Sequence, residues 1–278
     1  MPDGIKGPAP ASQGRITSIS SVNWSFTSFM LNREAGMVLK DGTEALQDLW
    51  YSTWEHDFAE GLPFVVNQTY SAADMAIITS KTQYPVVMPT PKNLPGAYVT
   101  PKPTDIAVKG VDATAYVSPD WSLDEAMADV QGATTSFELM IYQVTDPGLC
   151  SELFLAHRRG VNVTLLVSKE VFDARERHQA ETCYANLTKA GMAVQSTMSA
   201  FTYSHQKFWI TDGRRVSLSS GNWSPSDVPD ATAFPPYPDP AWVAANRDVN
   251  IHIEAPQLVT LFQTVLNEDY TRGEPWGP

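Results

Sequence analysis

The stretch Ser204–Ser224 places a histidine, a lysine and several small polar residues close enough together to act on one ligand. If this stretch begins as a β-strand, His205 and Lys207 point to the same face, because side chains alternate along a strand with a period of two. A neutral imidazole can attack phosphorus or transfer a proton, and an ammonium beside it can hold the non-bridging phosphate oxygens. The spacing therefore predicts a site for a phosphate ester.

The dipeptide Asp212-Gly213 is a strong indicator of a two-residue hairpin turn. With such a turn, the antiparallel register places Ser220 opposite His205 and Leu218 opposite Lys207. Because Asp212 lies at the turn, we expect it to shape the loop more than to take part in chemistry.

Two polar side chains beyond this turn complete the predicted site. Asn222 lies just past the position opposite His205, so its amide and the Ser220 hydroxyl can both donate to a phosphate. The predicted site thus combines one reactive nitrogen with three groups that hold an anion.

The end of this stretch recurs near the start of the chain. Arg214–Ser224 aligns without a gap on Arg15–Ser25, and seven of the eleven positions are identical. Asn32–Glu34 and Asn246–Asp248 share a second pattern, and each precedes an apolar strand-like run and then a helix-like stretch. We therefore interpret the chain as the end of one module followed by a second, more complete module.

A proline-rich segment separates the two modules. Proline at this density interrupts helices and central strands, so we predict a linker at 63–110 with one short strand at 84–88. The predicted domains are a remnant of the first module at 1–62, this linker, and the second module at 111–278.

Strand-like and helix-like segments alternate along the second module. This alternation predicts an α/β sandwich in which a mixed β-sheet is flanked by helices. The predicted elements are a capped helix starting at Ser122, strands over 137–144 and 161–168, and helices over 147–159 and 173–190.

Composition narrows the range of ligands and surroundings. The 278-residue chain has a formal net charge of -12, which disfavours broad, non-specific binding to a polynucleotide backbone. No run approaches the about 18–20 apolar residues of a membrane span, and the start lacks the pattern of a secretory signal.

Cys150 and Cys183 are too few to define a disulfide framework, and we expect two free thiols. Four histidines have no partner at metal-ligand or triad spacing and are assigned surface or core positions: His56, His157, His178 and His252.

The pattern His-x-Lys-x-x-x-x-Asp from 205 to 212, followed by Ser-Ser-Gly-Asn-Trp-Ser, resembles the motif of the phospholipase D superfamily. The resemblance extends over the whole second module. It implies a sandwich fold in which two such motifs face one another and act without a metal or other cofactor. The catalytic residues that it implies are His205, Lys207, Asp212, Asn222 and Asp248, with Asp248 orienting His205.

The same resemblance implies a set of phosphate-binding and supporting residues. Lys207, Ser220 and Asn222 hold the phosphate in the second module, and Asn23 does so from the first. Ser21 and Glu34 are the supporting residues of the first module.

The first module departs from the family pattern. The alignment of the repeat places Lys6, Pro8 and Gln13 at the three motif positions, so the motif itself is absent. Either the first half has been lost upstream or its motif has decayed. The preserved Asn23 and Glu34 favour the loss of an upstream half.

This departure matters because one imidazole cannot serve both steps of phosphodiester cleavage through a phosphohistidine. One nitrogen attacks phosphorus while a second imidazole protonates the departing oxygen and later deprotonates water. We therefore expect a partner histidine, either from a second copy in a two-fold homodimer or from a missing N-terminal half. In the second case the resemblance implies that His205 is the general acid and base.

The favoured function is hydrolysis or transfer of a phosphodiester, with a phospholipid as substrate. The loop 225–245 contains the aromatic residues Phe234, Tyr237 and Trp242, which could form an apolar lid over a lipid or a platform on which a base stacks. An ordinary proline-rich surface loop is the simpler interpretation. The alternatives are a nuclease of the same superfamily and a catalytically silent half that binds phosphate groups or pairs with another subunit. The sequence assigns no compartment.

Overall fold

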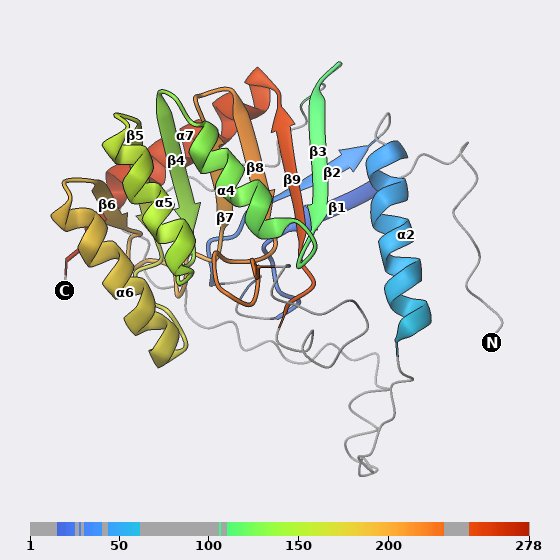
Figure 1. Ribbon diagram of the computed structural model, residues 1–278, viewed down its shortest axis with the longest axis horizontal. Helices are drawn as coiled ribbons and strands as arrows, with labels where there is room; N and C mark the ends of the chain where they lie inside the picture. Colours follow the sequence, from blue (N-terminus) through green and yellow to red (C-terminus); the bar gives the residue numbers. More distant parts are fainter. Residues whose placement is uncertain are drawn as a thin grey trace, which may run out of the picture.

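The computed structural model describes residues 16–25, 28, 31–40, 44–61, 106, 110–230 and 245–277 (Figure 1). Almost all of the predicted linker, including its strand at 84–88, lies outside the described residues. The aromatic residues of the proposed lid, Phe234, Tyr237 and Trp242, also lie outside them. The domain boundaries stay a prediction.

An eight-stranded mixed sheet forms the centre of the second module, with the strand order β10-β6-β5-β4-β7-β8-β9-β3. β4, β5 and β6 run parallel to one another, whereas the remaining neighbours pair antiparallel. The strands are β3 (Asp112–Val117), β4 (Ser136–Ile141), β5 (Asn162–Val167), β6 (Ala193–Ser196), β7 (Lys207–Thr211), β8 (Arg215–Ser219), β9 (Val249–Glu254) and β10 (Glu274–Pro275).

Three helices cover one face of this sheet (Figure 1). They are α4 (Ser122–Gly132), α5 (Pro147–Arg158) and α6 (Ala174–Lys189), and their apolar side chains share one core cluster with the strands. Because the parallel strands are covered on both faces, apolar side chains of β4 and β5 such as Leu139 and Leu165 are fully buried. The predicted strands and helices of this module are confirmed, with ends that differ by at most three residues.

The first module packs against the other face of the sheet, beside α7 (Pro256–Arg272). It contains the two-stranded sheet of β1 (Ile16–Ser20) and β2 (Gly36–Lys40), followed by α2 (Glu44–Glu60). Ile19 of β1 is fully buried in the same core cluster as Phe208 of β7 and Phe262 of α7. The first module is therefore part of the core that supports β7, the strand that follows His205.

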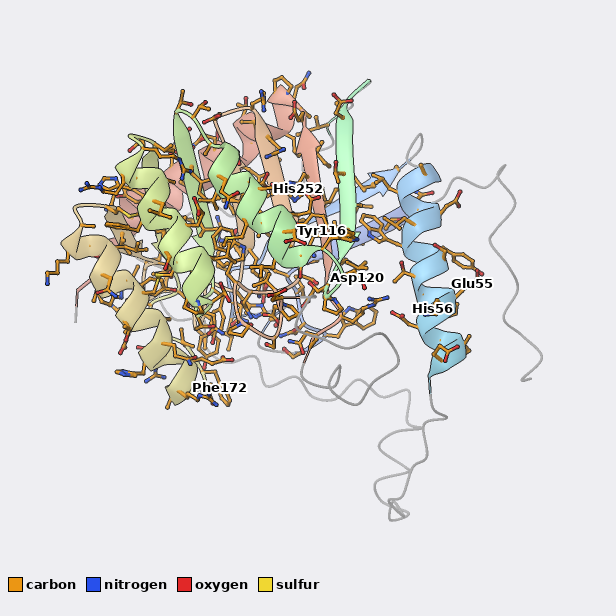
Figure 2. All side chains as sticks on the ribbon, viewed as in Figure 1. Glu55, His56, Tyr116, Asp120, Phe172 and His252 are labelled. Atoms are coloured by element: carbon orange, nitrogen blue, oxygen red, sulfur yellow. A yellow bond between two sulfur atoms is a disulfide. The ribbon has the colours of Figure 1, made fainter. Side chains whose placement is uncertain are left out.

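Two reciprocal ion pairs join the modules. Arg33 of the first module contacts Asp269 of α7 with both its Nε (2.9 Å) and a terminal nitrogen (3.3 Å). Arg247 of the second module contacts Asp57 of α2 in the same way, at 2.8 and 3.0 Å. Arg247 also pairs with Asp120, which lies after β3 on the side facing α2 (Figure 2). Since Arg33 and Arg247 occupy matching positions in the repeat, this exchange supports the interpretation of two related modules.

The structure corrects the predicted register of the hairpin. Phe208, not Lys207, pairs with Leu218, and Thr211 pairs with Arg215. The turn therefore has one more residue than predicted, with Asp212 and Gly213 both at positive φ. A shift of one residue also cancels the predicted pairing of Ser220 with His205.

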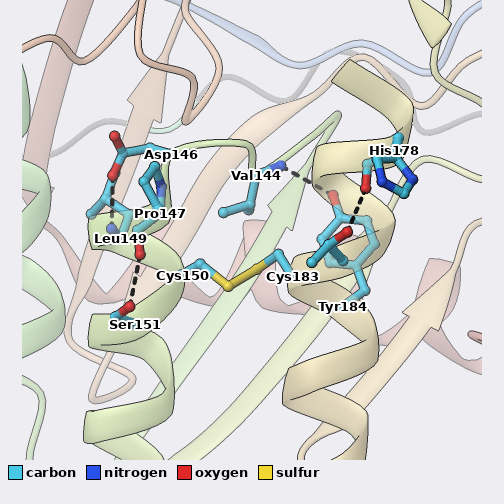
Figure 3. The surroundings of a disulfide bond; sticks show 10 residues. Val144, Asp146, Pro147, Leu149, Cys150, Ser151, His178, Cys183 and Tyr184 are labelled. Atoms are coloured by element: carbon cyan, nitrogen blue, oxygen red, sulfur yellow. Dashed lines mark hydrogen bonds between the residues drawn. A yellow bond between two sulfur atoms is a disulfide. The ribbon is translucent and has the colours of Figure 1, made fainter. Parts of the chain in front are cut away.

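The expectation of two free thiols is wrong. Cys150 of α5 and Cys183 of α6 form a disulfide with an S–S distance of 2.04 Å, which joins the two neighbouring helices (Figure 3). The sequence around each cysteine does not predict the disulfide, because the two cysteines come together only when both helices pack on the sheet.

Two further side chains have core roles. Ser122 begins α4 but does not cap it, because its hydroxyl is buried and donates to the Asp227 carbonyl at 3.2 Å. His252 of β9 lies between the sheet and α4, with Nε2 2.7 Å from the Tyr116 hydroxyl and Nδ1 3.0 Å from Asp129 (Figure 2). The predicted surface or core position of His252 is therefore a core position. Among the described residues, no helix combines the length and apolar character needed to cross a bilayer.

Candidate active site

His205 lies two residues before the start of β7, and the backbone of the first module holds it in place. The His205 N–H donates to the Arg33 carbonyl at 2.7 Å, and the Arg33 N–H donates to the Tyr203 carbonyl at 2.8 Å. The Thr202 N–H also donates to the Leu31 carbonyl at 3.0 Å. The segment that carries Glu34 therefore runs directly beside the segment that carries His205.

The contacts of the His205 ring define its tautomer. Nδ1 lies 2.9 Å from the Ser21 carbonyl oxygen and 3.2 Å from Glu34 Oε2, and both partners can only accept. Nδ1 therefore carries a proton and donates it, which leaves the lone pair on Nε2. Lys207 Nζ lies 2.8 Å from Nε2, and so the free lone pair faces an ammonium donor. This is the arrangement of a nitrogen prepared to attack phosphorus or to accept a proton.

Lys207 is almost completely buried although it carries an amine. Burial lowers the pKa of Lys207 to about 7, against the opposing attraction of the carboxylates of Glu34, Asp227 and Asp248. Its Nζ also lies 5.7 Å from the centre of the Tyr142 ring, within the range of a cation–π contact. An arriving phosphate would restore a counter-charge next to this amine, so Lys207 is suited to hold an anion.

Glu34, and not Asp248, is the carboxylate that contacts His205. The resemblance assigned this orienting role to Asp248, but the structure places Glu34 Oε2 at the imidazole. Burial acts to raise the pKa of Glu34, but the hydrogen bond and charge of His205, with Ser21 and Asn32, hold it below its ordinary value. The second-module histidine is thus oriented by a residue of the first module.

Asp248 occupies the matching position on the other side of the site. Ser220 donates to Asp248 Oδ1 at 2.7 Å, just as Ser21 donates to Glu34 Oε2 at 2.6 Å. Ser220 was predicted to hold phosphate, and its hydroxyl is instead engaged with this carboxylate. Burial raises the pKa of Asp248 to about 6, and the negative charge of Asp227 adds to the rise.

The two asparagines predicted to bind phosphate differ in their surroundings. The Asn222 backbone N–H donates to Asp227 Oδ2 at 2.7 Å, and its buried side-chain Oδ1 has no hydrogen-bond partner within the described part of the chain. Asn23 is exposed at the surface. The structure therefore brings Asn222 into contact with Asp227 and buries its side-chain oxygen, whereas it leaves Asn23 open to solvent.

Asp212 lies away from these groups and holds a turn. Its carboxylate accepts hydrogen bonds from the backbone N–H groups of residues 134–136 and from the hydroxyls of Thr134 and Thr135. Burial acts to raise its pKa, but these bonds hold the pKa of Asp212 well below its ordinary value. The expected role in shaping the loop agrees with these contacts, and the structure does not bring Asp212 to the imidazole.

Two residues of the site were missed in the sequence. Tyr142, at the end of β4, packs edge-on against the His205 ring with the ring centres 5.1 Å apart. Asp227 fixes the loop after Asn222 and accepts a hydrogen bond from Asn246 Nδ2. Tyr142 could have been found from its place at the carboxyl end of a buried strand, where polar groups converge. Asp227 had no such indicator, because it was included in an inserted loop.

No group of three or more histidine, cysteine or acidic side chains is arranged to hold a metal ion among the residues that the structure describes. The side chains that the structure brings together at the site are the imidazole, the amine and the surrounding carboxylates. Together they can bind an anion and offer one nitrogen lone pair to it.

Comparisons with known proteins show which family the second module resembles. A family model described as the PLD-like domain of cardiolipin synthase matches residues 127–270. The mitochondrial cardiolipin hydrolase of Danio rerio is 28% identical over 142 residues, which cover 51% of this chain and 54% of that protein. The mitochondrial cardiolipin hydrolase of Xenopus laevis is 30% identical over 105 residues, which cover 38% of this chain and 47% of that protein. The chain thus spans about half the length of the curated relatives that it matches.

A solved structure shows the same fold. The phospholipase D family member Nuc from Salmonella typhimurium superposes with a TM-score of 0.50 and 20% identity, covering 60% of this chain and 99% of that one. At this identity the likeness concerns the fold, and it confirms the predicted α/β sandwich. Since the family model covers more than half of the sequence, the chain belongs to the phospholipase D superfamily.

Proposed function

We propose that this chain provides half of a phosphodiesterase site of the phospholipase D type, with His205 as one of two opposed imidazoles and a phospholipid as substrate. The observation that carries the proposal is the environment of the His205 ring. Its Nδ1 proton is held by Ser21 and Glu34, and its Nε2 lone pair faces Lys207. A histidine with a purely structural role would not require the buried Lys207 amine beside its unprotonated Nε2, so this contact favours a role in chemistry.

The proposed chemistry follows from these contacts, and it makes His205 the nucleophile in place of the general acid and base that the resemblance implies for a missing first half. When Nε2 attacks phosphorus, a P–N bond forms and the P–O bond to the leaving group breaks. The ring then becomes cationic, and the Glu34 carboxylate stabilises that charge through Nδ1–H. Lys207 is placed to bind a non-bridging oxygen, and water later breaks the P–N bond. For an unactivated alcohol, a second imidazole must protonate the departing oxygen.

The choice of a phospholipid rests on the relatives and on charge. The curated relatives are named mitochondrial cardiolipin hydrolases. The net charge of -12 disfavours a long polynucleotide, because such binding relies on basic side chains that neutralise phosphates. Cleavage of a nucleic acid, or phosphate binding without turnover, would be visible as other outcomes of the same assay.

The test uses a substrate whose leaving group needs no acid. Bis(4-nitrophenyl) phosphate mixed with the unmodified chain should release one equivalent of nitrophenolate per chain in a burst, with a phosphoryl adduct on His205 detectable by mass spectrometry. The burst should be absent in His205→Ala and retained in His178→Ala, since His178 lies exposed on α6. Cardiolipin vesicles and a single-stranded oligonucleotide, tested with the same variants, separate lipid from nucleic-acid cleavage. An equal burst from His205→Ala would reject the proposal.

A further inference from the structure

A cavity of about 760 Å³ lies where the N-terminal ends of α4, α5 and α6 meet the loop 224–230. The three helices begin at the same end of the sheet, where the parallel strands β4 and β5 end (Figure 1). A volume of this size is typical of sites for small organic ligands. The cavity is distinct from the candidate active site, because neither His205 nor Lys207 nor Glu34 lines it.

The wall of this cavity is strongly acidic. Asp146, Asp173, Glu176 and Asp230 line it, and Arg175 is the one basic side chain among its described lining residues. Within the described part of the chain, Asp146, Asp173 and Glu176 form no ion pair and accept hydrogen bonds from neutral donors. The excess of negative charge therefore favours a cation as the occupant.

Two of these carboxylates also remove the usual reason for an anion to bind here. Helix N-termini attract anions because their first N–H groups lack partners. Asp146 caps α5 by accepting from the Leu149 N–H at 2.8 Å, and Asp173 caps α6 by accepting from two N–H groups of its first turn at 2.9 and 3.0 Å. Since the helix ends already have anionic partners, an added anion would meet repulsion instead of free donors.

Thr145 gives an independent indication of a ligand. It lies on the cavity wall, is only 7% exposed, and its hydroxyl has no hydrogen-bond partner among the residues that the structure describes. A buried hydroxyl without a partner is costly, so such groups normally contact another polar atom. In an acidic cavity, this hydroxyl is suited to accept a hydrogen bond from a cationic N–H group.

The cavity wall is held in place from two sides. The disulfide between Cys150 and Cys183 joins α5 to α6 about one helical turn beyond Asp146 (Figure 3). The N–H groups of Thr145 and Asp146 both donate to the Trp223 carbonyl, at 2.8 and 2.9 Å, which ties the end of β4 to the loop wall. A wall fixed in this way is organised before a ligand arrives, which lowers the cost of binding.

We propose that this cavity binds a protonated aliphatic polyamine, whose N–H groups contact the carboxylates of Asp146, Asp173 and Glu176 and the hydroxyl of Thr145. Several ammonium groups on one flexible chain suit carboxylates that come from separate elements. The hydroxyl selects a protonated amine over a quaternary ammonium ion, because the quaternary ion has no N–H to donate. This site goes beyond the proposed function, and neither depends on the other.

The first test measures spermidine binding to the unmodified chain by isothermal titration calorimetry. Because the net charge of -12 attracts any cation, the test needs a variant with the same change of charge elsewhere. Glu176→Gln on the wall should weaken binding at least about threefold. Glu181→Gln, an exposed change on the same helix outside the cavity, should bind spermidine as the parent does. Equal weakening by the two variants, or no saturable binding to the parent, would overturn the proposal.

The second test examines the role of the Thr145 hydroxyl. Thr145→Val removes the unpaired hydroxyl with little change of shape, and binding of putrescine should weaken about tenfold or more. The hexamethyl derivative of putrescine is also a dication but has no N–H, so it should bind weakly and equally to parent and variant. Unchanged putrescine binding in a folded Thr145→Val would contradict the proposal. If this variant does not fold, the comparison of Glu176→Gln with Glu181→Gln decides.

Other occupants of the cavity give different results. Mg²⁺ that binds more tightly than spermidine and is weakened by Glu176→Gln would assign the cavity to a metal ion and refute the proposal. Tighter binding of glycerophosphocholine would assign it to a lipid head group and also refute it. The proposed function fails separately. It fails if spermidine binds as expected but no adduct forms on His205, whereas an adduct without spermidine binding rejects only the cavity site.

Discussion

The two ion pairs between the modules have the same geometry but very different burial, and this difference predicts very different energies. Arg33 and Asp269 have side chains that are 11% and 2% exposed, whereas Arg247 and Asp57 are both 40% exposed. Removing one partner of a buried pair costs about 3–5 kcal/mol because a charge is left uncompensated. Removing one partner of an exposed pair costs about 0–1 kcal/mol. We therefore compare Arg33→Met with Arg247→Met, each of which keeps most of the apolar stem.

The structure also sets an upper limit on the larger cost. Asp269 in Arg33→Met can avoid a buried charge by taking up a proton, and burial already raises its pKa above the ordinary value of 3.8. At pH 7 that proton costs about 1.36 kcal/mol for each unit above 3.8, or about 4.4 kcal/mol in all, and at pH 5 about 1.6 kcal/mol. The folded variant binds the proton more tightly than the unfolded chain does, so its stability falls as pH rises across this window.

The assay is urea unfolding at pH 7 and pH 5, with the slope of free energy against denaturant checked for each variant. Arg33→Met should lose about 3–4 kcal/mol at pH 7 and recover about half or more of that loss at pH 5. Arg247→Met should lose about 1 kcal/mol or less at both values. Asp269→Asn on the Arg33→Met background should restore stability at pH 7, because no buried charge remains. Equal losses from both arginines, or a loss in Arg33→Met that does not change with pH, would refute the assignment of Arg33–Asp269 as the buried bond between the modules.

Three further predictions concern the amine, the disulfide and the turn. Because the pKa of Lys207 lies at about 7, binding of dimethyl phosphate, whose charge is constant, should weaken about tenfold per unit above pH 8; ligand-observed NMR on the Asp248→Asn background, which removes the carboxylate that titrates near pH 6, checks this, and Lys207→Met should bind weakly at every pH. Reduction of Cys150–Cys183, which closes a loop with a sequence separation of 33, should cost about 2–4 kcal/mol; the same loss in the double serine variant, measured by urea unfolding, confirms that the bond and not the reductant is responsible. Asp212→Ala should cost about 1–2 kcal/mol after allowance for solvent screening. Since the pKa of Asp212 is held below its ordinary value of 3.8, that contribution is present above pH 4 and is lost as pH falls, so parent and variant should converge in acid.

The sequence predicts the elements of the second module better than it predicts their contacts. Alternation of apolar runs locates β4, β5, α5 and α6 within three residues, because periodicity depends on local burial. The hairpin register failed by one residue, since the Asp212 carboxylate is drawn to the backbone of 134–136, a contact 76 or more residues away. The disulfide was missed for the same reason, because only the packed helices bring its cysteines together.

The candidate site shows the same division. The residues that share one stretch of sequence, His205 and Lys207, were predicted together and lie together. The carboxylate on His205 was assigned to Asp248 from within its own module, but Glu34 takes that place because the backbone of 31–33 runs beside His205. The family pattern assigns the carboxylate from the same module as the histidine. It does not predict that a carboxylate of the other module contacts the histidine, because that contact depends on how the two modules pack.

The contact between Glu34 of the first module and His205 of the second module gives the first module a role at the site. If the first module were only an inactive remainder, its polar residues would have no role at the site. Instead Ser21 and Glu34 hold the proton on His205 Nδ1, and Arg33 supplies both the backbone contact to His205 and the buried pair with Asp269. The second-module imidazole therefore has its reactive tautomer only because the first module is present. Asp248 makes the matching contact with Ser220, so the two modules place equivalent carboxylates at equivalent positions, and only the carboxylate of the first module contacts His205 among the described residues.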